Sequence, residues 1–281
     1  MQSGLGARHD GLAEATLPAP GAASLPAEFV RQALAVAEAE VRKLRHDPVE
    51  LLTRAVQPTL WLVVFGQVMS RVRAIPTGQV SYLDFMAPGI LAQSVLFIAI
   101  FYGISVIWER DLGVLHKFLV SPAYRGALVF GKAVSAGVRA LTQAIIVYLL
   151  AVLMGVQVQL TVPAVAGVLG FVVLGAAIFS TFSLVVACLV KTRERFMGIG
   201  QVLTMPLFFA SNAIYPLSVM PAWLQWISRV NPLTYQVDAL RGLMIQGGQS
   251  VAGLGVDFGV QAAVLLALLW LAARLYPNVI N

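Results

Sequence analysis

The stretch VPAVAGVLGFVVLGAAIFSTFSLVVACLV, from Val162 to Val190, runs without a single charged side chain. A helix that crosses the hydrocarbon core of a bilayer needs about 20 mostly apolar residues. This stretch is longer than that, and it has no polar face that water could cover. It therefore predicts a membrane-spanning helix, and with it an integral membrane protein.

The composition of the whole chain agrees with a membrane protein. Of the 281 residues, 59% are hydrophobic and 11% are charged, whereas soluble domains carry about 25% charged residues. The net charge of +6 lies in segments between apolar runs, and it is not accompanied by an aromatic-and-basic nucleic-acid motif. The lone Cys188 offers neither an internal disulfide nor metal-ligand spacing. We therefore expect lipid, not nucleic acid, around this chain, and no metal site.

Five further apolar segments are long enough to be candidate spans. With the first stretch they predict an all-α membrane protein with six transmembrane helices, at about 49–69, 85–108, 127–156, 162–190, 196–214 and 258–275. The segment 49–69 is the weakest candidate, because Arg54, Gln57 and Pro58 fall in its first turns. Six spans place both termini on the same side of the membrane.

The basic residues decide which side that is. Most of the Lys and Arg residues fall in the termini and in the connections after the even-numbered spans, and only Arg71, Arg73, Arg229 and Arg241 fall in the other connections. Because Lys and Arg concentrate on the cytoplasmic side, both termini are expected in the cytoplasm. Residues 1–27, rich in Ala, Gly and Pro, and residues 276–281 are then cytoplasmic tails.

Two non-spanning segments show helical periodicity on the cytoplasmic side. Residues 28–46 alternate an apolar stripe with a charged face, which predicts an amphipathic interface helix on the inner leaflet. A short coiled-coil seam is the alternative. Between spans two and three, Leu112, Leu115, Phe118 and Leu119 form an apolar stripe that Pro122 ends. Such an exposed amphipathic helix suits docking of a partner, although a helix that merely rests on lipid has the same pattern.

About 40 residues separate spans five and six, and they do not read as an ordinary loop. The runs Ile214–Leu217 and Trp223–Ile227 are apolar and aromatic, as is typical of a membrane interface. Residues 233–245 predict a further, partly inserted helix. We expect short re-entrant outer helices here, which must pack against protein or line a wet cavity.

The chain offers little sign of chemistry of its own. Residues 126–133 fit a phosphate loop except that Ala133 stands where a Ser or Thr hydroxyl must hold magnesium. His9, His46 and His116 all fall in cytoplasmic segments. No catalytic site and no cofactor are therefore expected in this chain. The remaining polar residues of the spans are neutral; bonds between helices explain them most simply, but they also suit the lining of a path for an amphiphile. The candidate path residues are Gln57, Phe65, Gln93, Phe97, Gln201 and Asn212.

Taken in order, four motifs resemble those of type-2 ABC exporter permeases, in the branch of daunorubicin-resistance and nodulation-factor permeases. They are Arg45–Pro48 with Gln57–Trp61, then Phe85–Ile90, then Glu109–Gly113 running to Ser121-Pro122 and Gly131-Lys132, and finally Asn231–Tyr235 with Leu240–Gly242. The similarity covers about residues 28–275. It implies that the segment between spans two and three is the coupling helix.

The resemblance also implies a division of labour. Two six-span halves, identical or paralogous, form a dimer above two separate ABC ATPase subunits, which bind the ATP and Mg. The expected ATPase contacts are Glu109, Arg110, Leu115, Lys117 and Phe118. The expected function is export of an amphiphilic substrate, such as a drug-like metabolite, a lipid or a lipid-linked glycan, across a bacterial inner membrane.

Three other functions remain open on the sequence alone. An ion-coupled secondary transporter normally places Asp or Glu inside its bundle, and here Asp84, Glu109, Asp238 and Asp257 all lie near predicted span ends. A membrane enzyme acting on lipid would turn over without a partner. A non-transporting scaffold or sensor would bind an ATPase without stimulated hydrolysis.

Overall fold

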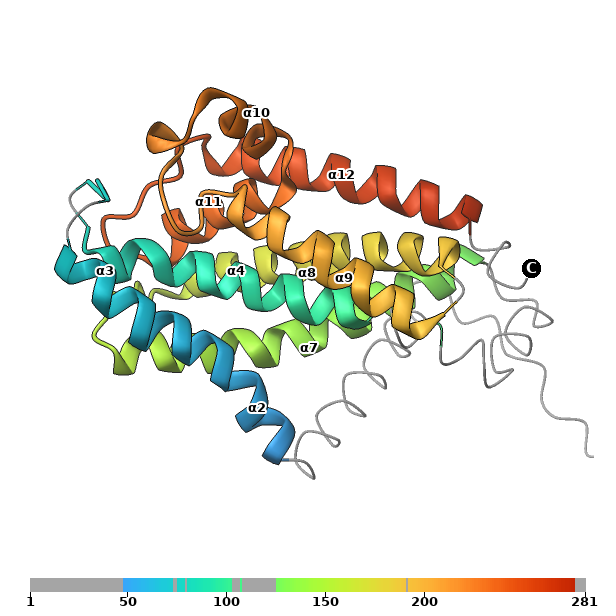
Figure 1. Ribbon diagram of the computed structural model, residues 1–281, viewed down its shortest axis with the longest axis horizontal. Helices are drawn as coiled ribbons and strands as arrows, with labels where there is room; N and C mark the ends of the chain where they lie inside the picture. The colour runs from blue at the N-terminus through green and yellow to red at the C-terminus, as the bar shows by residue number, and fades with distance from the viewer. Residues whose placement is uncertain are drawn as a thin grey trace, which may run out of the picture.

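The computed structural model describes residues 48–72, 75–78, 80–102, 107, 125–190 and 192–275. These residues are helical apart from connections and one isolated β-bridge between Val158 and Ile245 (Figure 1). The two tails, the interface helix expected over 28–46 and the coupling helix expected over about 110–121 lie outside the described residues.

Four described helices are long and apolar enough to cross a membrane. They are α4 (Tyr82–Tyr102), α7 (Arg125–Leu153), α8 (Val162–Leu189) and α12 (Leu254–Leu275). They fall on four of the expected spans, with ends shifted by a few residues. Helix α4 is the most buried of the four and α12 the most exposed. This supports the prediction of a multi-pass membrane protein.

The segment expected as the first span is a continuous run of three helical parts, a π-helix between two α-helices. An α-helix, α2 (Pro48–Thr59), runs into a π-helix, η1 (Leu60–Gly66), and then into α3 (Gln67–Val72). Pro58 lies just before the change, and proline has no N–H to continue the α-helical pattern. The Thr59 hydroxyl donates to the Ala55 carbonyl at 2.7 Å. The wider π turn accommodates this local loss of α-helical bonds.

The helix expected as the fifth span is shorter than predicted. Helix α9 is Arg193–Phe209, with 17 residues, whereas 196–214 was expected. It begins where the Thr192 hydroxyl accepts from the Arg195 N–H at 3.4 Å. It ends where the Ser211 hydroxyl turns back to the Phe208 carbonyl at 2.7 Å, shortly after Pro206. The chain then continues as irregular backbone through residues 210–216.

Three short helices occupy the connection between α9 and α12. They are η2 (Leu217–Val219), α10 (Ala222–Val230) and α11 (Pro232–Met244). The expected helix over 233–245 is therefore present. Asn231 caps α11 by accepting from the Leu233 N–H at 3.0 Å, and its amide donates to the Leu207 carbonyl at 2.7 Å. This one side chain ties the start of α11 to the last turn of α9.

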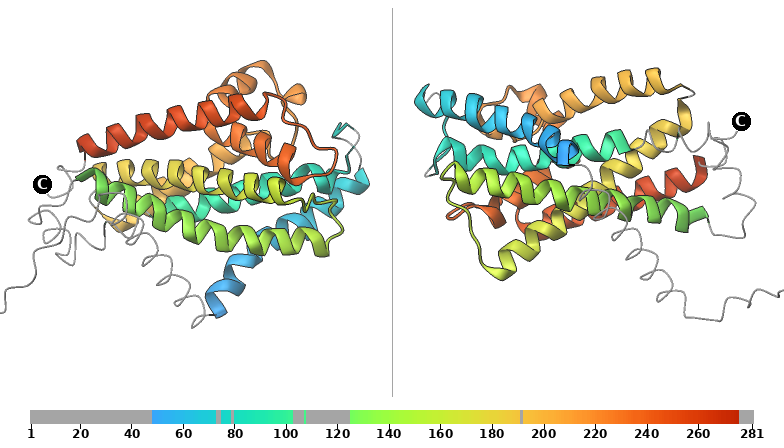
Figure 2. Two further views of the ribbon diagram at one scale, coloured as in Figure 1. Left: turned by 180° about the vertical axis from the view of Figure 1, so that it is seen from behind. Right: turned by 90° about the horizontal axis from the view of Figure 1, so that it is seen from below.

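Helix α11 packs within the bundle, against α4, α8 and α12 (Figures 1 and 2). Two glycines of α8 make room for it. A Cβ on Gly175 would lie 2.2 Å from the Gln236 amide nitrogen, and one on Gly167 would lie 3.0 Å from Leu243. On α4, a Cβ at Gly89 would lie 2.5 Å from the Ala213 carbonyl. Small residues thus let α11 and the backbone of 210–216 approach the long helices closely.

Candidate functional site

The six expected path residues lie on or beside four elements, α2, η1, α4 and α9. Gln57 and Phe65 are half-buried on α2 and η1, Phe97 is half-buried on α4, and Gln201 is exposed on α9. Helix α4 contacts both η1 and α9. Gln93 and Asn212 are 1% and 2% exposed, so the six side chains do not share one open face of this chain. Their role in a substrate path stays a prediction.

A cluster of rings joins the first helix to the end of α9. The Trp61 ring lies 5.1 Å from Phe65, 5.5 Å from Phe208 and 6.5 Å from Phe209, each in an edge-on arrangement. Aromatic pairs at such distances contribute about 0.5–1.5 kcal/mol each beyond the burial of their surface. The ring cluster therefore holds η1 against α9. Among its rings, Phe65 is a candidate path residue and Trp61 ends one of the four sequence motifs.

An apolar groove of about 960 Å³ opens between α9 and α10. Its lining is mostly aliphatic, proline and aromatic side chains, among them Leu203, Leu207, Phe209, Trp223, Trp226 and Val230. The Tyr215 hydroxyl, which also lines the groove, donates to the Phe209 carbonyl. The Arg229 guanidinium lies 5.4 Å from the centre of the Trp226 ring. The groove thus offers an apolar surface with aromatic rings and one cation nearby, as at a membrane interface.

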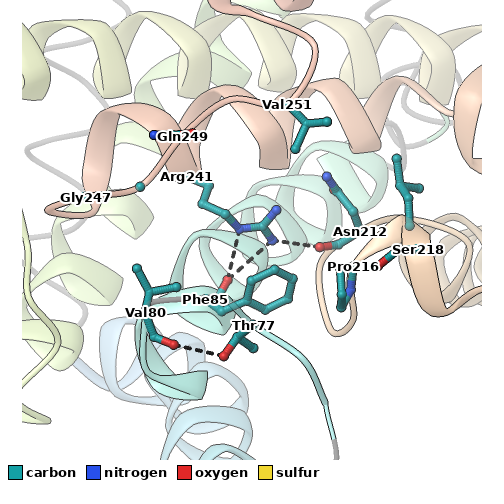
Figure 3. Close-up of a pocket in the computed structure, with 12 residues that line it drawn as sticks. Thr77, Val80, Phe85, Asn212, Pro216, Ser218, Arg241, Gly247, Gln249 and Val251 are labelled. Atoms are coloured by element: carbon teal, nitrogen blue, oxygen red, sulfur yellow. Dashed lines mark hydrogen bonds between the residues drawn. The ribbon is translucent and has the colours of Figure 1, made fainter.

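The buried Arg241 of α11 holds three segments together (Figure 3). Its Nε and Nη2 donate to the Phe85 carbonyl at 3.4 Å, and Nη2 also donates to the Asn212 carbonyl at 2.7 Å. The guanidinium carbon lies 3.8 Å from the centre of the Phe85 ring. Arg241 therefore fastens α11 both to the first turn of α4 and to the irregular backbone after α9. We call these contacts the Arg241 clamp.

The guanidinium of Arg241 stays charged although it is buried. Burial lowers the pKa of the Arg241 guanidinium to about 10, while the negative charge of Asp238, one turn earlier, acts in the opposite direction. Because that pKa is still well above 7, the guanidinium stays charged at neutral pH. Backbone carbonyls such as those of Phe85 and Asn212 are suitable acceptors for a buried cation.

Next to the clamp, two buried carboxylates meet the connection into α12. Asp238 accepts from the Ala252 N–H at 2.8 Å and from the Ser250 hydroxyl at 3.2 Å. The same hydroxyl lies 2.7 Å from a carboxylate oxygen of Asp257 and accepts from the Gly253 N–H at 2.8 Å. Both acids are almost wholly buried. Asp257 lies in the first turn of α12, near a span end as the sequence predicts. The structure adds that both carboxylates are buried.

The clamp also borders a cavity of about 530 Å³ (Figure 3). Thr77 and Val80 line it from the connection before α4, and Asn212 and Ser218 from the segment after α9. Gln249 and Val251 complete it from the connection after α11. Three stretches far apart in the sequence thus meet around one buried guanidinium.

Sequence reasoning noted Arg241 only as an outer-loop cation and as part of a motif. A signal was available: Asp238 and Arg241 are a charged pair at helical spacing within a segment expected to be partly inserted. The sequence does not show which groups the guanidinium contacts, because Phe85 lies 156 positions away along the chain. The expected ATPase-coupling residues Glu109, Arg110, Leu115, Lys117 and Phe118 lie outside the described residues.

The long apolar helices and the buried α11 define a multi-pass, all-helical membrane protein. The chain belongs to the ABC-2 type transporter family, whose model matches residues 31–245. This agrees with the resemblance stated from the four motifs, and it gives the chain the role of a membrane permease.

Individual relatives point to the same family. The chain is 31% identical to a putative transport permease, ycf38, of Cyanophora paradoxa, over 76% of this chain and 74% of that relative. It is 26% identical to the daunorubicin resistance ABC transporter permease protein DrrB1 of Streptomyces coeruleorubidus, over 83% and 82%. It is 25% identical to the probable doxorubicin resistance permease DrrC of Mycobacterium tuberculosis, over 81% and 82%. Relatives of drug-resistance exporters are thus prominent among the matches.

Proposed function

We propose that this chain is the membrane-spanning half of an ATP-driven exporter of amphiphilic molecules. Two such halves pair, and two separate ABC ATPase subunits bind ATP and Mg beneath them. In this arrangement α2–η1–α3 and α9 complete a set of six spans, and both termini lie in the cytoplasm of a bacterial cell. Drug-like metabolites, lipids and lipid-linked glycans are the substrate classes that fit.

The observation that carries this proposal, beside the family match, is apolar surface left exposed on the first helix, α9 and α10, which the ring cluster and the groove bring together. Val56, Leu60, Val63, Val64 and Val68 are exposed along the first helix. On the neighbouring elements, Val202 and Phe209 of α9 and Trp223, Trp226 and Val230 of α10 are exposed as well. Lipid alone can cover such a face, but a second permease half placed there encloses the π-helix, the ring cluster and the apolar groove. An amphiphile then has a path between two such faces.

The coupling helix supplies the test of the ATPase partnership. The chain is co-expressed with its candidate ATPase, purified, and assayed for ATP hydrolysis with and without a panel of amphiphiles. Phe118→Asp, on the apolar stripe, is expected to abolish ATPase co-purification and stimulated hydrolysis. His116→Asn, on the polar remainder of the same segment, is the matched control and is expected to retain both. Equal behaviour of the two variants contradicts the proposed docking site.

The buried Asp238 and Asp257 favour one alternative function, that of an ion-coupled carrier. Two buried acids inside a bundle are a feature that an ion-coupled carrier needs. Uptake into vesicles separates the two functions. Transport that persists without ATP and without the ATPase, but stops when the ion gradient is collapsed, favours the carrier. ATPase binding without any substrate-stimulated hydrolysis favours a scaffold or sensor.

A further inference from the structure

The guanidinium of Arg241 has donor capacity that the clamp does not use. A guanidinium carries five N–H donors, and the bonds of the clamp use those of Nε and Nη2. In the described part of the chain, the guanidinium donates these hydrogen bonds through Nε and Nη2 and none through Nη1. Figure 3 shows this third nitrogen without a dashed line, on the side of the guanidinium toward Val251. One edge of a buried cation is thus open for another acceptor.

The charge of Arg241 is likewise not balanced by direct contact. The side chain is 7% exposed, and in the described part of the chain no carboxylate forms an ion pair with it. Asp238 acts on it through its charge, but the bonds of that carboxylate go to Ser250 and Ala252. Buried charges in proteins are normally paired, because removing a charge from water is costly. A cation without a contacting anion, beside a cavity, therefore points to an anion from outside the chain.

The cavity has the size and lining for more than a free ion. Its volume of about 530 Å³ falls in the range of about 300–1,000 Å³ typical of small-molecule sites. Arg241, Asn212, Ser218 and Gln249 give it polar groups. Val80, Phe85, Leu217 and Val251 give it apolar wall. A charged group attached to a short apolar stem matches both parts.

We propose that this cavity binds the anionic head group of an amphiphile, with one phosphate or carboxylate oxygen on the open edge of Arg241. The shared chemistry is an anionic oxygen that accepts charge-assisted hydrogen bonds from a guanidinium. Its source is either an anionic lipid or a free anion. The inference goes beyond the proposed function, because it concerns equilibrium binding by this chain and requires neither transport nor an ATPase.

Val251 gives a way to fill the site without touching the clamp. It is exposed and lies in the connection between α11 and α12, so substitutions there leave the packed helices intact. Val251→Glu places a tethered carboxylate at the open edge of Arg241, as an internal competitor. Val251→Gln has nearly the same size and no charge, and it serves as the matched control.

The full-length chain, purified in detergent, is titrated with dihexanoyl phosphatidylglycerol, with dihexanoylglycerol, which has the same acyl chains and no anionic oxygen, and with inorganic phosphate, and binding is measured by calorimetry. Wild type is expected to bind the anionic lipid at least about tenfold more tightly than the uncharged one, since loss of a charge-assisted hydrogen bond costs that much. Because Val251 is part of the cavity wall, Val251→Gln is expected to weaken the binding of both lipids but to keep the preference for the anionic one. Val251→Glu is expected to lose this preference while its melting temperature is unchanged or higher.

The outcomes of these titrations distinguish a lipid head group from a free anion, and they include results that overturn the inference. Preference for the lipid, with no effect of inorganic phosphate, identifies a head-group site. Phosphate binding that Val251→Glu abolishes identifies a site for the free anion, and also supports an anion at Arg241. Equal affinity for the two lipids together with no phosphate binding by wild type overturns the inference, as does an identical response of the Glu and Gln variants. Neither result bears on ATPase coupling, which the Phe118 variant tests separately.

Discussion

Helices α10 and α11 follow one another in the chain, yet they differ in burial. Helix α11 packs against α4, α8 and α12, and its charged and amide side chains are buried. Helix α10 leaves Trp223, Trp226 and Val230 exposed, and Ser228 is its buried residue. The first is a fixed part of the bundle, whereas the second presents an apolar surface to something outside this chain.

The contrast extends to the arginines of the two helices. Arg241 of α11 and Arg229 of α10 each lie against an aromatic ring, at 3.8 and 5.4 Å from its centre. Only Arg241 also bonds to backbone carbonyls of two distant segments. Arg241 therefore holds distant segments of the fold together, whereas Arg229 lies on the surface of α10. Substitutions of Arg241 and of Arg229 are therefore expected to differ widely in their effect on stability.

The largest effect is expected from Arg241→Met. Methionine fills much of the same volume but removes the bonds to Phe85 and Asn212. Hydrogen bonds from a charged donor contribute about 1.5–3 kcal/mol each, so a loss of about 4 kcal/mol in the free energy of unfolding is expected. Thermal unfolding of the purified chain in detergent measures it. A melting temperature equal to that of wild type shows that the clamp does not hold α11.

A smaller loss is expected from charges placed on exposed apolar faces, and it depends on what covers each face. Leu266 of α12 and Val64 of η1 are both exposed. An Asp at the centre of a lipid-facing helix costs about 2.5–3.5 kcal/mol of insertion free energy. Leu266→Asp is therefore expected to reduce the inserted protein by about a hundredfold.

Val64→Asp is the matched partner of that variant. If the first helix faces the second half and a wet path, Val64→Asp is inserted at near wild-type levels and changes export instead. Quantifying membrane-integrated protein for both variants decides the matter. Equal losses at both positions mean that lipid covers both faces, and this contradicts the proposed arrangement of the halves.

Features that depend on length and composition could be predicted from the sequence, whereas features that depend on contacts between distant segments could not. The long uncharged run 162–190 gave α8 almost to the residue, because spanning a bilayer is a matter of length and composition alone. The short helices after α9 were also expected, from aromatic residues and the period of 233–245. The π-helix was not, since Pro58 marks a disturbance without specifying how the backbone absorbs it.

The candidate site was harder to predict than the fold. The path residues are neutral polar groups in apolar runs together with two phenylalanines, Phe65 and Phe97. That criterion cannot tell Gln93, which is buried, from Gln201, which is exposed. The Arg241 clamp depends on contacts between α4, the 210–216 backbone and α11, segments brought together only by the packing of the whole bundle. Close approaches at Gly89 and Gly175 are invisible in the sequence for the same reason, because a glycine does not reveal which neighbour it admits.

The next effect in size tests one of those approaches. Gly89→Ala puts a methyl group 2.5 Å from the Ala213 carbonyl, where backbone has to move. Overpacking of this kind costs about 1–3 kcal/mol, so we expect a loss of about 2 kcal/mol. Gly259→Ala on α12 is the matched control, because nothing lies within 4 Å of the added Cβ. It is expected to be neutral or slightly stabilising. The two melting temperatures are compared directly, and if Gly89→Ala melts no lower than Gly259→Ala, the close contact of α4 with the 210–216 backbone is wrong.

The smallest effect is expected from the exposed arginines. Arg229→Gln removes the contact with Trp226, and Arg274→Gln removes the 4.3 Å contact of Arg274 with Trp270 at the end of α12. Cation–π contacts at exposed sites contribute about 0.5–1 kcal/mol, so each variant is expected to lose less than about 1 kcal/mol in thermal unfolding. Because Arg229 lies beside the groove between α9 and α10, its loss is expected to change substrate-stimulated ATP hydrolysis while that of Arg274 does not. A large loss of stability from Arg229→Gln would show that α10 is as firmly built into the bundle as α11, and the contrast between the two helices would not hold.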